Sequence, residues 1–341
     1  LGQRLGLSKS ASGVAAGLVA IDPLLVRYAS QPMTESLCTL LVTAWLLALL
    51  TCLERSTVAR GWWCGVLIGL CGLCRPTIWS TAGLVGVWFL WRAWRRRTEG
   101  SDSGAAEVRL AGSDLRPVLA GLAGTLLVIA PWVVRNMVVF GRPILTTTHG
   151  GYTLLLGNNP SFYGEVVRQE WGAVWDGSHG QGQTGWVEGL QTEMQLEGIV
   201  GEVAQDQWMN DRGWNNIRAD LGGFLQAAML RLVRFWNVLP MGDARSGWSG
   251  RVLTSIACFY SAQWLLMFAG VVDVVRRRVV AYGPALLLLL SFTAVHLVYW
   301  SNVRMRAPLV PVLAILAVHG AEVIRRKFRR VNGVANPASS A

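Results

Sequence analysis

Apolar runs of about 14 to 20 residues recur along this chain, and clusters of basic residues separate them. A helix rising about 1.5 Å per residue needs runs near that length to cross the hydrocarbon core of a bilayer. Only 15% of the 341 residues are charged, whereas a soluble domain carries about a quarter, and 52% are hydrophobic. The pattern predicts an all-α integral membrane protein, a polytopic helix bundle.

We expect about eight spans, five within residues 1–134 and three within 252–323. Their expected bounds are 11–25, 36–53, 61–73, 78–91, 117–134, 252–275, 281–300 and 308–323. In the third span Gly61, Gly65 and Gly69 recur at four-residue spacing. One face of that helix is therefore bare, which predicts close packing on a neighbouring helix.

The distribution of charge orients the bundle. Basic residues gather in an inner linker, 92–116, in the turn 276–278 and in a tail, 324–341, whereas 11 of the 20 acids lie between Asn136 and Gly250. Short basic connections stay in the cytoplasm. We therefore expect a multi-pass inner (cytoplasmic) membrane protein with both ends of this chain cytoplasmic. The net charge of +11 then reflects topology, and no nucleic-acid partner is expected.

Residues 135–251 form the expected extracytoplasmic loop region. We expect 164–189 to be irregular, 192–219 to be a polar helix, and 221–239 to be an amphipathic helix lying in the membrane interface. A ninth span at 221–239 is the alternative. No pair of His or Cys residues has metal-ligand spacing, so no metal site is assigned, and the sequence leaves a requirement for a divalent metal open.

The stretch from Pro131 to Pro160 opens this polar region. Glycines and an Asn-Pro turn there favour unusual backbone shapes. We interpret the stretch as a polar platform facing water, and its candidate binding residues are Arg135, Asn136, Tyr152, Asn158 and Asn159.

Ionisable residues also recur where spans meet the expected outer face; they are Asp22, Glu35, Arg75, Arg135, Arg304 and Arg306. Charges near hydrocarbon are unfavourable, by roughly 2.5–3.5 kcal/mol at mid-helix. The set suggests an anionic ligand bound by arginines, with a carboxylate for chemistry, because guanidinium matches phosphate oxygens. Alternatives stay open: each arginine as a snorkelling anchor, Glu35 as a first-turn helix acid, Asp22 as a helix terminator.

Five runs, in this order, resemble the GT-C polytopic glycosyltransferases. They are MTESL (33–37), LCRPT (73–77), PWVVRNMVVFG (131–141), GGYTLLLGNNP (150–160) and NVRMRAPLVPVLAILA (302–317). The similarity is to the protein O-mannosyltransferase and aminoarabinose-transferase type, including bacterial dolichyl-phosphate-mannose-mannosyltransferase-like proteins.

The resemblance implies transfer of a sugar, with inversion, from a polyprenyl-phosphate donor to an extracytoplasmic lipid, glycan or protein. It implies no certain cofactor. Glu35 would match the acid of the outer-turn helix, Arg75 the basic hinge residue, and Arg135, Arg304 and Arg306 the outer-face arginines. We take Glu35 and Asp22 as candidate catalytic residues and the arginines, Asn136, Tyr152, Asn158 and Asn159 as candidate substrate-binding residues.

One departure stands out. The family's principal acid lies in a large first outer loop after an N-terminal span, and no counterpart precedes the span at 11–25. We expect either a fragment of an active transferase or an inactive relative. The rival hypotheses are a transporter or flippase of lipid-linked anions and a non-catalytic binding subunit. A transporter predicts internal hydropathy symmetry, and no such repeat is visible.

Overall fold

The computed structural model describes residues 1–99, 115–175, 177, 181–241, 245, 247–277 and 279–331. All regular secondary structure in these residues is helical, which confirms the all-α prediction. The first half contains η1 (Gly2–Leu5), α1 (Lys9–Ala20), α2 (Pro23–Ala29), α3 (Glu35–Glu54), α4 (Val58–Cys74), α5 (Ile78–Glu99) and α6 (Arg116–Phe140).

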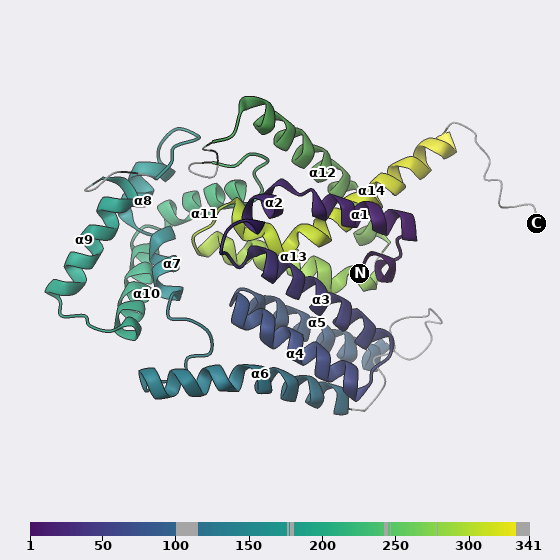
Figure 1. Ribbon diagram of the computed structural model, residues 1–341, viewed down its shortest axis with the longest axis horizontal. Helices are drawn as coiled ribbons and strands as arrows, with labels where there is room; N and C mark the ends of the chain where they lie inside the picture. The colour runs from purple at the N-terminus through teal and green to yellow at the C-terminus, as the bar shows by residue number, and fades with distance from the viewer. Residues whose placement is uncertain are drawn as a thin grey trace, which may run out of the picture.

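The remaining helices fall into two groups. The middle of the chain holds α7 (Gly150–Gly157), α8 (Pro160–Phe162), the π-helical turn η2 (Tyr163–Val167), α9 (Gly182–Leu196), α10 (Glu202–Ala219) and α11 (Leu221–Phe235). The last group is α12 (Gly250–Arg276), η4 (Val280–Tyr282), α13 (Gly283–Val298), η5 (Val303–Leu309) and α14 (Val310–Val331). Figure 1 shows α7 to α10 gathered at one side of the bundle formed by the long apolar helices.

Five helical segments are long and apolar enough to cross a membrane: Glu35–Glu54, Arg116–Phe140, Gly250–Arg276, Val280–Val298 and Val303–Arg329. The number becomes six if α1 and α2 count as one broken span, because they meet at an angle of 53°. The described residues therefore support a multi-pass membrane protein with fewer spans than the eight expected. The difference lies in α4, which has only 17 residues, and in α5, whose apolar part runs into Arg92 and Arg95.

The centre of the bundle is α14. In the segment Val303–Arg329, which η5 and α14 form together, buried residues make up 78% of the apolar window, compared with 17% for α6 at the periphery. It packs against α1 and α12. At the α12 contact a Cβ on Gly270 would lie 2.1 Å from the carbonyl oxygen of Leu316, so only glycine permits this approach.

The predicted bare face of α4 packs directly on α6. A Cβ added to Gly61 would lie 2.0 Å from the Pro117 carbonyl oxygen, and one on Gly65 would lie 1.8 Å from that of Gly121. Thr125 donates a hydrogen bond across the same contact to the Gly65 carbonyl, at 3.0 Å. Small residues thus let the two backbones approach closely, and the prediction from glycine spacing is confirmed.

Several expected boundaries are wrong. Apolar helix α6 continues through Pro131 to Phe140 rather than stopping at residue 134, and Gly141 ends it with a left-handed φ of 68°. The helix expected over 192–219 is two helices, because Gly198 and Gly201 take φ values of 67° and 91° between them. Segment 164–189 is not wholly irregular, since it contains most of η2 and the start of α9.

The expected interfacial helix 221–239 corresponds to α11, which packs against α13. All three basic segments reach beyond the described part of the chain. Residues 100–114 of the inner linker, residue 278 of the turn and 332–341 of the tail lie outside it.

Candidate functional site

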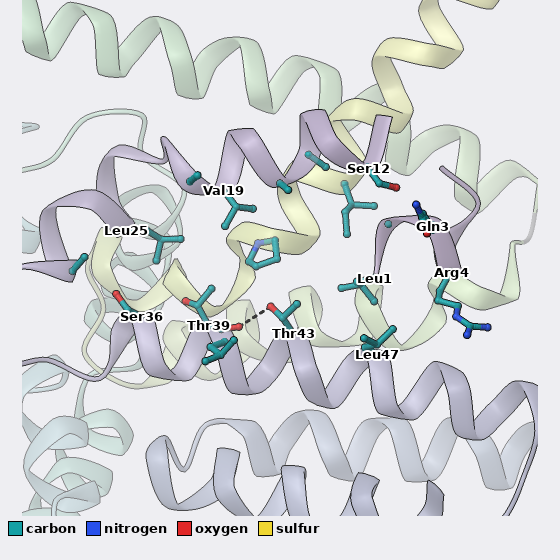
Figure 2. Close-up of a pocket in the computed structure, with 18 of the residues that line it drawn as sticks. Leu1, Gln3, Arg4, Ser12, Val19, Leu25, Ser36, Thr39, Thr43 and Leu47 are labelled. Carbon is teal, nitrogen blue, oxygen red and sulfur yellow. Dashed lines mark hydrogen bonds between the residues drawn. The ribbon is translucent and has the colours of Figure 1, made fainter. Parts of the chain in front are cut away.

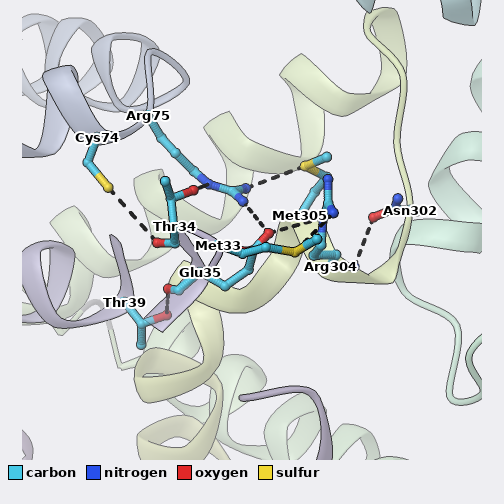
Figure 3. A network of polar contacts seen from close by, with 9 residues as sticks. All are labelled: Met33, Thr34, Glu35, Thr39, Cys74, Arg75, Asn302, Arg304 and Met305. Carbon is cyan, nitrogen blue, oxygen red and sulfur yellow. Dashed lines mark hydrogen bonds and ion pairs between the residues drawn. The ribbon is translucent and has the colours of Figure 1, made fainter. Parts of the chain in front are cut away.

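Glu35 lies at the centre of an ion-pair cluster at the first residue of α3. Its Oε1 is 2.6 Å from Nη2 of Arg75 and 3.0 Å from Nε of Arg304 (Figure 3). The three residues come from positions far apart in the chain, and all three were predicted to share a site. We call this group the Glu35 cluster.

Local structure at each element explains how the three side chains meet. Thr34 precedes α3 without capping it through its side chain, and Glu35 lies in the first turn, where the helix dipole favours an acidic residue. Arg75 ends α4 in an extended conformation, with φ of −147°, directly before Pro76, which cannot continue a helix. Arg304 follows Asn302, whose side chain caps η5 by accepting from the Arg304 backbone N–H at 3.1 Å.

Neutral neighbours hold the two guanidinium groups in place. Arg75 donates through Nε to Thr34 Oγ1 at 3.3 Å, and its Nη1 lies 3.4 Å from the sulfur of Met305. Arg304 places Nη1 3.3 Å from the sulfur of Met33, and its guanidinium lies 6.0 Å from the Tyr28 ring centre. Figure 3 shows both methionines beside the guanidinium groups. The arginines are therefore oriented by the protein.

The charge balance of the Glu35 cluster favours an anion. The Glu35 side chain is 2% exposed, that of Arg75 is 13% and that of Arg304 is 31% exposed. Two guanidinium groups face one carboxylate, which leaves a formal excess of one positive charge in a largely dry site. Within the described residues Glu35 Oε2 is buried and accepts no hydrogen bond. An added anion would thus find two oriented donors, with Arg304 open to solvent.

Asp22 and Arg306 form a second buried polar group beside Tyr260. Asp22 Oδ1 accepts from the backbone N–H groups of Leu24 at 3.0 Å and Leu25 at 3.1 Å, and from the Tyr260 hydroxyl at 3.1 Å. Asp22 therefore caps the beginning of α2, directly after α1 ends at Ala20, so the expected first span is broken at this point.

Arg306 is buried, with 1% of its surface exposed. Its Nη1 donates to the carbonyls of Phe235 at 3.1 Å and Asn237 at 2.5 Å. Its guanidinium lies 4.3 Å from the centre of the Tyr260 ring. Arg304 and Arg306, two residues apart on η5, thus serve different groups, and Arg304 alone joins the Glu35 cluster.

Arg135 and Asn136 lie on α6, apart from the Glu35 cluster. The Arg135 guanidinium lies 5.2 Å from the Trp132 ring and 5.4 Å from the Phe140 ring. It donates to Asn136 Oδ1 at 2.9 Å, and buried Asn136 donates to the Ile144 carbonyl at 2.8 Å. Asn136 thus secures the turn after α6, and Arg135 has the contacts of an exposed anchor.

The remaining predicted site residues, Tyr152, Asn158 and Asn159, contact neighbouring protein groups in the region of α7 and α8. The Tyr152 ring lies beside the His149 ring in a tilted arrangement, with ring centres 4.9 Å apart. Buried Asn158 donates to the carbonyls of Leu154 and Val298, each at 2.7 Å, and buried Asn159 caps α8 by accepting from the Phe162 N–H at 2.8 Å. Both amides are occupied by protein groups in this structure.

Arg231, on α11, is a buried cation that was not among the predicted site residues. It donates to the carbonyls of Leu297, at 2.9 Å, and Gly157, and to Asn158 Oδ1 at 3.3 Å. Burial lowers the pKa of Arg231 to about 10 and raises that of nearby Tyr163 to about 12. The sequence signal that could have indicated a buried Arg231 is the turn at 157–159. Its backbone carbonyls need hydrogen-bond donors once the segment is buried.

No group of three or more His, Cys, Asp or Glu side chains able to hold a metal occurs in the described residues. Comparison of the chain with family models, with curated proteins and with solved structures found no match.

Proposed function

We propose that this chain is a GT-C-like membrane glycosyltransferase that moves a sugar from a polyprenyl-phosphate donor to an extracytoplasmic acceptor. The observation that carries the proposal is the Glu35 cluster, a buried carboxylate flanked by two oriented guanidinium groups from three separate elements. The motifs that resemble GT-C transferases contain all three residues. Its place in a helical membrane bundle suits a donor whose lipid lies in the bilayer.

The assigned chemistry follows from the charges. Arg75 and Arg304 bind the donor phosphate, since guanidinium offers paired donors to phosphate oxygens. The acceptor hydroxyl attacks the anomeric carbon from the face opposite the phosphate, and the bond from that carbon to the phosphate oxygen breaks. The electron pair stays on the lipid phosphate, where the guanidinium charges stabilise it. We assign the acceptor's proton to Glu35 Oε2, the oxygen without a hydrogen bond in the described residues.

The experiment is a transfer assay with the full chain in lipid nanodiscs. A panel of polyprenyl-phosphate hexoses and pentoses is supplied with extracytoplasmic lipids, glycans and peptides, and released polyprenyl phosphate is measured. Glu35→Gln should lower kcat roughly 10²–10⁴-fold, the range for loss of a general base. Glu54→Gln is the matched control, because Glu54 ends the same helix in an exposed pair with Arg4. Absence of transfer by the wild-type chain with every pair would contradict the proposal.

A second candidate is a transporter of lipid-linked anions, and one observation favours it. The pair α1 and α2 is bent by 53° at a short break, and broken helices are common at transporter binding sites. In proteoliposomes a transporter moves a labelled polyprenyl-phosphate sugar between leaflets without releasing its phosphate. That result would replace the transferase proposal.

A further inference from the structure

Helices α12 and α14 pack closely and bring their basic ends together. A Cβ on Gly320 would lie 2.8 Å from the backbone nitrogen of Gly270, so the backbone contact fixes the register of the two helices. Arg276 and Arg326 each follow one of these glycines by six residues, a rise of about 9 Å along either helix. The two arginines therefore lie at about the same level. Figure 1 shows the last turns of α14 projecting beyond the bundle.

Exposed basic residues gather around this level on both helices. They are Arg276, Arg277, Arg325, Arg326, Lys327 and Arg329, which we call the α12–α14 basic cluster.

Asp273 and Glu322 lie beside the cluster, and both carboxylates are already paired. Asp273 Oδ1 is 2.8 Å from Arg277 Nε, and its Oδ2 is 3.1 Å from His319 Nε2 on the neighbouring helix. Glu322 pairs with Arg326 at 3.3 Å. Within the described residues the other four members of the cluster form no ion pair. The α12–α14 basic cluster therefore keeps surplus positive charge.

Such a surplus is not general among the basic residues of this bundle. Figure 2 shows Arg4 at one end of a pocket between α3 and the helices α1 and α14. Arg4 pairs with Glu54, so the two formal charges at that end of the pocket balance. The α12–α14 basic cluster differs because six cations share two carboxylates.

The apolar surface of α12 places the cluster at the surface of the bilayer. Leu265, Phe268 and Val275 are each more than half exposed, and helical periodicity turns them away from the Gly270 contact. This exposed apolar face continues to Val275, directly before Arg276. The segment Gly250–Arg276 has 27 residues and is about 40 Å long, so it extends past a hydrocarbon core of about 30 Å into the head-group layer.

Charge and apolar surface together favour a lipid as the occupant. Guanidinium groups donate well to phosphate oxygens. Phe328 is exposed among the basic residues of α14, and basic helices with an exposed aromatic residue suit the membrane interface. A water-soluble acidic partner would use the charge alone, whereas an anionic phospholipid uses the charge and the adjoining apolar face of α12.

We propose that the α12–α14 basic cluster binds anionic phospholipid from the surrounding bilayer. The phosphate of the head group contacts the cluster, and the acyl chains lie along the exposed apolar face of α12. This site is separate from the Glu35 cluster and independent of the reaction proposed there. Basic residues near a membrane surface each strengthen the binding of anionic lipid, roughly fivefold.

The test compares two phospholipids that have the same acyl chains. The full chain in detergent is titrated with dioleoyl phosphatidylglycerol, which is anionic, or with dioleoyl phosphatidylcholine, which has no net charge, and native mass spectrometry records occupancy. Wild-type protein should prefer phosphatidylglycerol by at least about 25-fold, the effect of two surface cations. The double variant Arg276→Gln and Arg325→Gln should lose most of this preference and bind phosphatidylcholine as wild type does.

The matched control is the double variant Arg168→Gln and Arg218→Gln. It removes the same charge from exposed positions outside α12 and α14, and it should keep the preference. Arg276→Lys with Arg325→Lys should also keep it, because the charge remains. An unchanged preference in the folded Arg276→Gln and Arg325→Gln variant would overturn the proposal. An equal loss in the control would do the same, since net charge alone would then explain the binding. Displacement of the lipid by equimolar glycerol phosphate would show a site for free anions and would also overturn it.

A photocrosslinker at Phe328 keeps the proposal testable if the double variant does not fold, because this side chain is exposed beside the cluster. Crosslinking is carried out in membranes, and the attached species is identified by mass spectrometry. Recovery of anionic phospholipid above its share of the bulk lipid supports the proposal. Recovery of lipid in the bulk proportions, or of a polypeptide, overturns it.

Discussion

The two ends of α3 carry the same chemistry in opposite settings. Glu54 at the last residue pairs with Arg4, and the side chains are 40% and 49% exposed. Glu35 at the first residue pairs with Arg75 and Arg304, and its side chain is 2% exposed. One end is a surface pair that water screens, whereas the other is a buried cluster that joins three elements.

The difference shows that the chain buries charged groups at the Glu35 end of α3, where loss of hydration is unfavourable. A surface ion pair contributes roughly 0–1 kcal/mol to stability, and its loss changes little. A buried ion pair is often no more stabilising than apolar residues of similar volume, yet removal of one partner destabilises by roughly 3–5 kcal/mol. Two guanidinium groups on one buried carboxylate are therefore poorly explained by stability alone. The surplus positive charge is what the proposed binding of a phosphate would use.

The largest expected effect is that of Glu35→Gln on stability. Loss of the carboxylate leaves two largely buried guanidinium groups facing each other, so we expect destabilisation of about 3 kcal/mol, the lower part of the range for buried pairs because Arg304 is 31% exposed. Glu54→Gln should cost less than about 1 kcal/mol. Reversible unfolding of both variants in mixed detergent micelles measures the comparison. Equal losses would show that the ends of α3 do not differ as described.

A smaller effect should separate the two arginines of the Glu35 cluster. Arg75→Ala removes contacts to Glu35, Thr34 and Met305 from a side chain that is 13% exposed. We expect a loss of about 2 kcal/mol, the size of a charged hydrogen bond with a buried partner. Arg304→Ala should lower the free energy of unfolding by about 1 kcal/mol. The loss is smaller because Arg304 is 31% exposed, so water can replace part of its interaction with Glu35. The same unfolding assay tests the order, and a larger loss for Arg304→Ala would contradict it.

Much of the fold and part of the site could be predicted from the sequence. Apolar runs located the long helices, and glycine spacing identified the α4 face that packs on α6. Glu35, Arg75 and Arg304 were grouped because charges at span ends need partners, and the structure joins them. Asp22 and Arg306 were grouped with them but form a separate contact with Tyr260, because Asp22 caps α2.

The failures share one physical reason. Periodicity identifies an apolar face but not which polar residue a neighbouring element will cover. Arg231 was not singled out from the sequence, yet burial against the ends of α7 and α13 gives it the carbonyls of Gly157 and Leu297. Asn158 and Asn159 were interpreted as ligand groups, whereas their amides serve the carbonyls and N–H groups of the turn that contains them.

Salt should produce the smallest and most selective effect. Added NaCl screens an exposed ion pair but has little access to a buried one. Raising NaCl from low to about 1 M should shrink the stability difference between wild type and Glu54→Gln by a few tenths of a kcal/mol. The difference between wild type and Glu35→Gln should stay constant, since Glu35 is 2% exposed. Unfolding at both salt concentrations measures this, with Arg4→Gln expected to repeat the Glu54→Gln result. A salt-sensitive Glu35 difference would mean that salt ions reach the Glu35 carboxylate itself, and would contradict its description as buried.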